Sequence, residues 1–97
     1  MTAPRRKQRQ IVALARGRVQ GVGYRAFCAD MAMRLNVEGY AKNLPDGRVE
    51  VVGEADEATL RQFVEHLREG PPMSRVEDVH YRWEEPTGEY RGFEAII

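Results

Sequence analysis

The chain has 97 residues, which is room for one small domain. Hydrophobic residues make up 42% and charged residues 31% of it, a balance typical of a folded globular protein rather than a disordered one. The longest purely apolar run, from Ile11 to Ala15, is far too short to span a bilayer. The single cysteine, Cys28, excludes an internal disulfide and favours a reducing, cytoplasmic location.

The net charge of zero conceals an uneven distribution along the chain. The first 29 residues contain seven bases and no acid, whereas the chain from Asp30 onward contains eight bases and fifteen acids. Four of the seven bases fall in residues 1–9, which we expect to be a disordered basic tail ahead of one domain over residues 10–97. The other three are Arg16, Arg18 and Arg25, and they indicate an anionic partner for this part of the chain.

The first part of the domain predicts a strand, a loop and a helix in that order. Branched and small apolar residues over 10–16 indicate a strand. Three glycines among the seven residues 17–23 predict a loop. Apolar residues at helical spacing then mark one face of a helix that ends near Asn36, a residue that tolerates the left-handed conformation. That face carries Tyr24, Cys28, Met31 and Leu35.

The second part predicts a hairpin, a second helix and two further strands. Segments 39–42 and 48–53 flank a turn that Pro45 and Gly47 favour, so they should pair as antiparallel strands. Asp56 is placed to cap a helix that the Gly-Pro-Pro sequence at 70–72 ends. The apolar face of this helix carries Leu60, Phe63, Val64 and Leu67. Alternation then predicts a strand through Val79, Tyr81 and Trp83, and a short last strand through Phe93, Ala95 and Ile97.

The predicted order is therefore β-α-β-β-α-β with a short extra C-terminal strand. Two helices with one apolar face each predict an α+β protein, in which both helices cover one side of a mostly antiparallel sheet. This two-layer sandwich is the ferredoxin-like arrangement. The same architecture supports many functions, so the activity has to be argued from the residues of a site.

The glycine loop between the first strand and the first helix is the candidate anion site. The first backbone N–H groups of a helix lack internal partners and carry partial positive charge, and glycines allow several of them to surround a small anion. Arg25 falls in the first helical turn, where the helix dipole makes a cation unfavourable. A bound phosphate would account for it, because the guanidinium matches two phosphate oxygens.

Other chemistries fit the sequence less well. Segment 21–26 matches a loose dinucleotide-binding pattern, but that pattern requires parallel β-α-β units, whereas the second and third strands here are joined by a hairpin. A P-loop would need Lys followed by Ser or Thr, and neither follows Gly23. The nucleophile candidates are Ser74, in the turn after two prolines, and Cys28, on the apolar face of a helix. His66 and His80 are expected at the surface, and no metal-ligand spacing is present. A catalytic phosphate site would therefore use direct attack by water.

Two motifs carry a resemblance to a known family. Residues 17–25 (GRVQGVGYR), followed by 39–43 (GYAKN) and 46–50 (DGRVE), resemble both signatures of the acylphosphatases, and the resemblance extends from residue 10 to the C-terminus. It implies a small, cytosolic, ferredoxin-like enzyme without metal or cofactor, and we expect a monomer because no heptad pattern or large apolar surplus indicates assembly. Such enzymes hydrolyse the carboxyl–phosphate bond of acyl phosphates to a carboxylate and inorganic phosphate. The chain departs modestly at Tyr24, where Phe is also common, at Ala41 and at Asn36.

The resemblance also assigns roles to residues. By this analogy Arg25 binds the phosphate and Asn43, at the end of the second strand, orients the attacking water. The backbone amides of the loop complete the phosphate cradle, and they belong to Val19, Gln20, Gly21, Val22, Gly23 and Tyr24.

Two alternatives belong to other functional classes. Ferredoxin-like domains also read RNA through aromatic residues exposed on two central strands, but strand 10–16 has no aromatic residue and Tyr40 is a lone candidate. The other alternative is a regulatory or substrate-channelling phosphate module, like the acylphosphatase-like segment of larger hydrogenase-maturation proteins. The length of 97 residues argues against it, because almost nothing is left to form further domains. We therefore expect a small-molecule acyl phosphate as the partner, rather than nucleic acid or a membrane.

Overall fold

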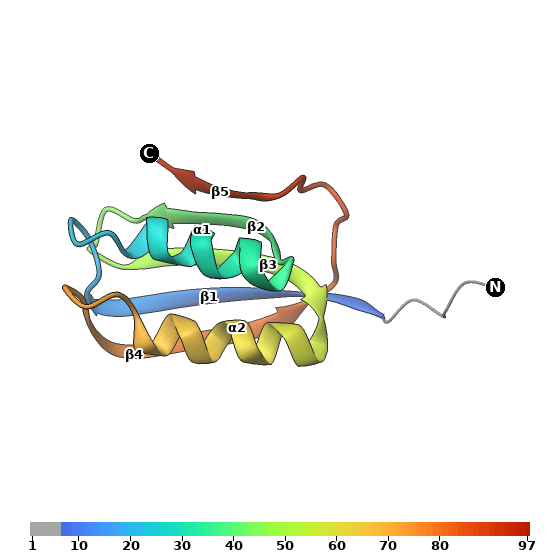
Figure 1. Cartoon of the computed structure of the whole chain (residues 1–97), viewed down its shortest axis with the longest axis horizontal. Helices are drawn as coiled ribbons and strands as arrows, with labels where there is room; N and C mark the ends of the chain where they lie inside the picture. The colour runs from blue at the N-terminus through green and yellow to red at the C-terminus, as the bar shows by residue number, and fades with distance from the viewer. Residues whose placement is uncertain (1–6) are drawn as a thin grey trace.

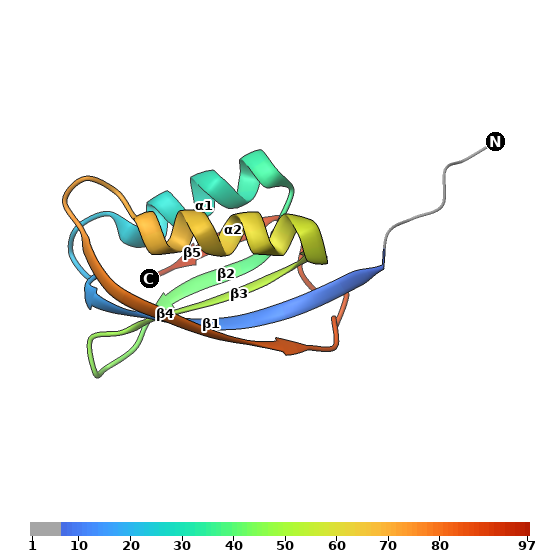
Figure 2. The ribbon, with the colours of Figure 1, turned by 90° about the horizontal axis from the view of Figure 1, so that it is seen from below.

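The computed structural model describes residues 7–97, which form a five-stranded sheet with two helices packed on one of its faces (Figures 1 and 2). The order of elements confirms the predicted ferredoxin-like sandwich with one extra strand. The elements are β1 (Gln8–Arg18), α1 (Tyr24–Leu35), β2 (Glu38–Asn43), β3 (Val49–Asp56), α2 (Glu57–Glu69), β4 (Arg75–Glu84) and β5 (Phe93–Ile96).

The strands lie in the order β4-β1-β3-β2-β5, and every neighbouring pair is antiparallel except β2 and β5. Strands β1 and β2 both run antiparallel to β3, so both end at the same end of the sheet. Strand β5 runs parallel to β2 and ends there as well. This topology gathers three segments that are far apart in the sequence: the glycine loop, the β2–β3 turn and the last residues of the chain.

The core lies between the sheet and the helices, as the apolar patterns predict. Alternate residues of β1 (Ile11, Ala13 and Ala15) are completely buried against the helices. The four apolar positions predicted for α2 are all buried, and so are the α1 positions Tyr24, Cys28 and Ala32. Within residues 7–97, neither helix is long and apolar enough to cross a membrane.

Both predicted helix boundaries are confirmed. Asn36 ends α1 in the left-handed conformation, with φ 58° and ψ 41°. Asp56 precedes α2, and its side chain accepts a hydrogen bond from the backbone N–H of Thr59 at 2.8 Å.

Strand β1 extends two residues beyond its prediction at each end. Gly17 and Arg18, predicted to lie in the glycine loop, pair with β4 and belong to the strand. Gln8 and Arg9 pair with Asp56 and Ala55 of β3, so they belong to the sheet. The prediction missed them because both side chains are polar and break the apolar pattern. Of the rest of the predicted tail, Lys7 precedes the strand and residues 1–6 lie outside the described residues.

A buried carboxylate on the other face of the sheet secures the connection between β4 and β5. Glu54 is only 7% exposed and accepts hydrogen bonds from Gln10 Nε2 (2.7 Å), from the backbone N–H groups of Thr87 (2.7 Å) and Gly88 (3.0 Å), and from the Thr87 hydroxyl. Burial by itself raises the pKa of Glu54, but these hydrogen bonds outweigh it and hold the pKa below its usual value.

This depressed pKa predicts a specific dependence of stability on pH. The charged Glu54 stabilises the fold fully above the unfolded-state pKa of about 4.3, and this contribution is lost as the pH falls through the lower folded-state pKa. We expect Glu54→Gln to cost about 1–3 kcal/mol at pH 7, because the new amide leaves buried donors unpaired. Urea unfolding from pH 7 to pH 3 should show this cost shrinking in acid. Glu94→Gln, at an exposed position, is the control; an equal cost at every pH would contradict the prediction.

Candidate active site

The glycine loop joins β1 to α1 at the end of the sheet where β2 and β5 also end (Figure 1). At the entrance to the loop, Gly17 has φ +124°, and a Cβ atom there would lie 2.2 Å from the carbonyl oxygen of Arg75. Gly21 and Gly23 are in the left-handed region, with φ +72° and +79°. Glycine is therefore required at Gly17 by space and conformation, and favoured at the other two by conformation alone.

The start of α1 is open to an anion. Gly23 is the N-cap residue, no side chain caps the helix, and the first turn contains no acidic residue. The first amide N–H groups of a helix have no partner within the helix, and the helix dipole favours negative charge at this position.

A hollow of about 200 Å³ lies against this helix start. It brings together four of the residues predicted to bind phosphate, Val19, Gly21, Gly23 and Tyr24, with the predicted catalytic arginine, Arg25. The remaining wall is apolar and consists of Ala26, Ala95 and Ile97. The other two predicted loop residues, Gln20 and Val22, do not line the hollow.

Arg25 is held at the hollow by the last strand. Its Nη1 donates a hydrogen bond to the backbone carbonyl of Ile96 in β5. Among residues 7–97 no carboxylate forms an ion pair with this guanidinium, so its charge is not neutralised by the described protein. A planar guanidinium has five N–H donors, and a single carbonyl leaves others for an anion in the hollow.

The side chain of Gln20 connects the glycine loop to the β2–β3 turn. Its Nε2 donates to the carbonyl oxygens of Leu44 (2.8 Å) and Arg48 (2.9 Å), one on each side of the β2–β3 turn. This contact fixes the glycine loop to the turn that immediately follows Asn43. The structure therefore assigns the Gln20 side chain to positioning, and leaves only its backbone N–H for a ligand.

Asn43, the predicted water-orienting residue, is the last residue of β2. It is in phase with Gly39 and Ala41, which are buried on the helix-covered face. Its Oδ1 is buried and has no hydrogen-bond partner among the described residues. A buried acceptor without a donor is costly and calls for a functional account. Asn43 shares the end of the sheet with the hollow but does not line it.

The described residues offer no nucleophile or metal cluster here. Cys28 is completely buried in the core, as predicted, and burial raises the pKa of its thiol to about 12. The thiol therefore stays protonated at neutral pH and is a poor nucleophile. Within residues 7–97 no group of three or more His, Cys, Asp or Glu side chains could hold a metal ion.

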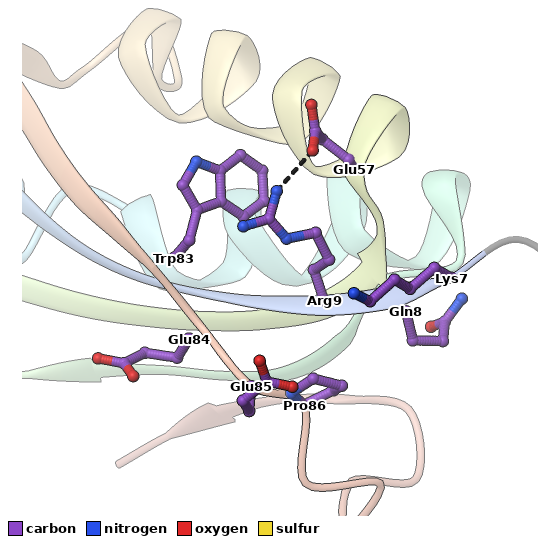
Figure 3. Close-up of a pocket in the computed structure, with 8 residues that line it drawn as sticks. All are labelled: Lys7, Gln8, Arg9, Glu57, Trp83, Glu84, Glu85 and Pro86. Carbon is purple, nitrogen blue, oxygen red and sulfur yellow. Dashed lines mark hydrogen bonds and ion pairs between the residues drawn. The ribbon is translucent and has the colours of Figure 1, made fainter.

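A second hollow, of about 440 Å³, lies at the opposite end of β1 (Figure 3). Arg9 crosses it, with its guanidinium carbon 4.1 Å from the centre of the Trp83 ring and its Nη1 2.5 Å from Glu57. This guanidinium is already paired and stacked, so we do not assign it to an anion. The half-buried Trp83 packs against the core, as the sequence predicts.

The aromatic residues of the open sheet face do not form the exposed platform that an RNA-binding sheet uses. The Tyr40 hydroxyl donates to Glu50 Oε1 at 2.8 Å, and its ring lies beside that of Tyr90 with 5.9 Å between centres. Carboxylates beside these rings repel a phosphate backbone.

Sequence reasoning missed three contributors to this end of the sheet: the β5 residues Ala95 and Ile96, the side-chain contact of Gln20, and the hydrogen bond from the Tyr24 hydroxyl to the Leu67 carbonyl. All depend on neighbours distant in the sequence. One signal was available for Tyr24, because Pro71 lacks an N–H group and so leaves a carbonyl of α2 without its helical donor.

Comparisons with known proteins agree with this architecture. Residues 11–95 match the family model described as Acylphosphatase. The chain is 54% identical over 84 residues to an acylphosphatase of Thermus thermophilus, and this alignment covers 87% of this chain and 94% of that protein. The crystal structure of an acylphosphatase from Bacillus subtilis superposes with a TM-score of 0.87 at 35% identity, covering 92% of this chain and 99% of the other. An acylphosphatase structure from Coxiella burnetii gives 0.85 at 30% identity, covering 92% and 93%.

Proposed function

Because the chain belongs to the acylphosphatase family, and is therefore an enzyme that hydrolyses acyl phosphates, we propose that the hollow at the start of α1 binds the phosphate group of the substrate. The observation that carries this proposal is the convergence, in one hollow of about 200 Å³, of an uncapped helix start, left-handed glycines and an arginine that has no carboxylate partner among residues 7–97. Each of these features favours a small anion, and a phosphate uses all three.

Arg25 and the loop amides would supply the charge stabilisation. Phosphoryl transfer passes through a loose transition state with negative charge spread over the phosphoryl oxygens. The guanidinium would bind two of these oxygens, and the amide N–H groups from Val19 to Tyr24 would bind the remaining one. Such preorganised donors stabilise the transition state without reorganisation during the reaction.

Asn43 would orient the attacking water. Its buried Oδ1 lacks a donor within the described protein, and a water molecule bound between Asn43 and the hollow would provide one. A carboxamide is not a base at neutral pH, so Asn43 would place the water in line with the bond to be broken rather than take its proton.

The reaction then needs no separate acid or base. The water oxygen bonds to phosphorus while the bond from phosphorus to the acyl oxygen breaks, and the electron pair of that bond leaves on the carboxylate. The residues that line the hollow include no Asp, Glu or His. Burial also raises the pKa of Tyr24, so its hydroxyl stays protonated. We therefore assign the water proton to an oxygen of the transferred phosphate.

The proposal predicts metal-independent hydrolysis of a simple acyl phosphate. We expect the purified protein to hydrolyse benzoyl phosphate at an undiminished rate in excess EDTA, with inorganic phosphate as a competitive inhibitor. Release of benzoate can be followed by absorbance, and p-nitrophenyl phosphate, which lacks an acyl leaving group, is the matched control. Loss of activity in EDTA that added Mg²⁺ restores would contradict the proposed mechanism.

A further inference from the structure

We propose that the hydroxyl of Tyr24 is a positioning group, which fixes the start of α1 against the end of α2 and thereby holds the loop amides in their binding arrangement. The inference rests on the proposed function for its effect on phosphate. It does not rest on that function for its effect on the loop.

The first observation is the place of Tyr24 in the chain. It is the first residue of α1 and lies between Gly23 and Arg25, both of which line the hollow. Its side chain is only 1% exposed, and its hydroxyl donates a hydrogen bond of 2.7 Å to the carbonyl of Leu67, 43 residues away. This hydrogen bond links the helix that begins at the hollow to the last turn of the other helix.

The second observation explains why the Leu67 carbonyl needs this donor. In a continuing helix it would accept from the N–H of the fourth residue along, but that residue is Pro71, which has none. The N–H of Gly70 is already donated to His66. A buried carbonyl without a donor is strongly disfavoured, so the Tyr24 hydroxyl is firmly held at this acceptor.

The effect on the loop follows from its flexibility. Gly21 and Gly23 have no side chains to hold them in their left-handed conformations, and a Cβ atom at either position would meet no neighbour within 4 Å. Val22 packs against the core from within the loop, and two side-chain hydrogen-bond contacts anchor its flanks, from Gln20 on one and from the Tyr24 hydroxyl on the other. Removing one anchor lets the amides between them move away from the bound anion.

Tyr24→Phe tests the proposal, because it removes the hydroxyl and keeps the buried ring. We expect the inhibition constant of inorganic phosphate and the KM for benzoyl phosphate to rise about fivefold, the fold-change that corresponds to one ordinary hydrogen bond. We expect kcat to change by less than twofold, because the loop amides would hold the phosphate oxygens equally in the bound substrate and in the transition state, and Arg25 and Asn43 remain. The matched control is Asp56→Ala, which removes the cap at the distant start of α2. It should lower the urea midpoint of unfolding and leave both constants unchanged.

Two results would overturn the proposal. The first is a Tyr24→Phe protein with a lower urea midpoint but with both constants within twofold of the parent, since the hydroxyl would then only stabilise the fold. The second comes from amide hydrogen exchange, which does not depend on activity. We expect the amides of Gly21 and Gly23 to exchange about fivefold faster in Tyr24→Phe and not in Asp56→Ala; equal rates in all three proteins would refute the positioning role. Absence of hydrolysis in the parent would refute the proposed function alone.

Discussion

Replacing Arg25 by alanine is expected to reduce kcat/KM for benzoyl phosphate about 10³-fold or more and to abolish measurable inhibition by inorganic phosphate. The guanidinium is the one cationic group that lines the hollow within residues 7–97. Its loss therefore removes the positive charge that would stabilise the phosphate in both the bound substrate and the transition state. Arginines that contact a transferring phosphoryl group contribute on this scale in other enzymes. Steady-state kinetics with phosphate as inhibitor measures both effects.

Arg25→Lys separates the shape of the side chain from its charge. Lysine keeps the charge but cannot hold the Ile96 carbonyl and two phosphate oxygens in one plane, so we expect it to restore less than a tenth of the lost activity. Arg34→Ala is the matched control, because Arg34 lies on the same helix and pairs with Asp30 on the exposed side. If Arg25→Ala kept near-normal affinity for phosphate, the assignment of this residue would be wrong.

Asn43→Ala is expected to reduce turnover without weakening the binding of phosphate. We expect kcat to fall about 10²- to 10³-fold, while the inhibition constant of phosphate stays within twofold, because the residue would act on the water and not on the phosphate. Because the substitution also removes a buried acceptor that has no protein donor within residues 7–97, the urea midpoint should stay unchanged or rise.

The comparison for Asn43→Ala is Lys42→Ala, at the exposed preceding position of β2. We expect it to leave kcat and the phosphate inhibition constant unchanged. An equal loss of turnover and phosphate binding in Asn43→Ala, together with a lower urea midpoint, would instead mark Asn43 as a residue that holds the turn.

The parts of the fold that sequence predicted well are those with local physical signals. The face of α2 repeats at helical spacing between a capping Asp56 and a Gly-Pro-Pro terminator, and all its predicted apolar residues are buried. Asn36 was predicted as a left-handed helix end for a conformational reason, and it has φ 58°. The glycine loop was identified in the same way, because its glycines permit backbone conformations that other residues avoid.

The parts that sequence could not predict depend on contacts between distant segments. Nothing in residues 93–96 indicates that β5 pairs in parallel with β2, yet this pairing brings the Ile96 carbonyl to Arg25. The local pattern also placed the start of β1 at Gln10, whereas Arg9 already belongs to the strand and is held by Glu57 and the Trp83 ring. Side-chain positions at the candidate site could be read only from the folded chain.

The hydrogen bonds from Gln20 to the β2–β3 turn indicate where this domain would tolerate inserted residues. The side chain holds the carbonyls of Leu44 and Arg48, which flank the exposed tip formed by residues 45–47. The spacing of the two carbonyls, rather than the length of the tip, determines how the turn meets the glycine loop. We therefore expect residues inserted at this tip to be tolerated near the candidate site, provided that they keep the spacing of Leu44 and Arg48 that the Gly47 N–H also supports by donating to the Leu44 carbonyl.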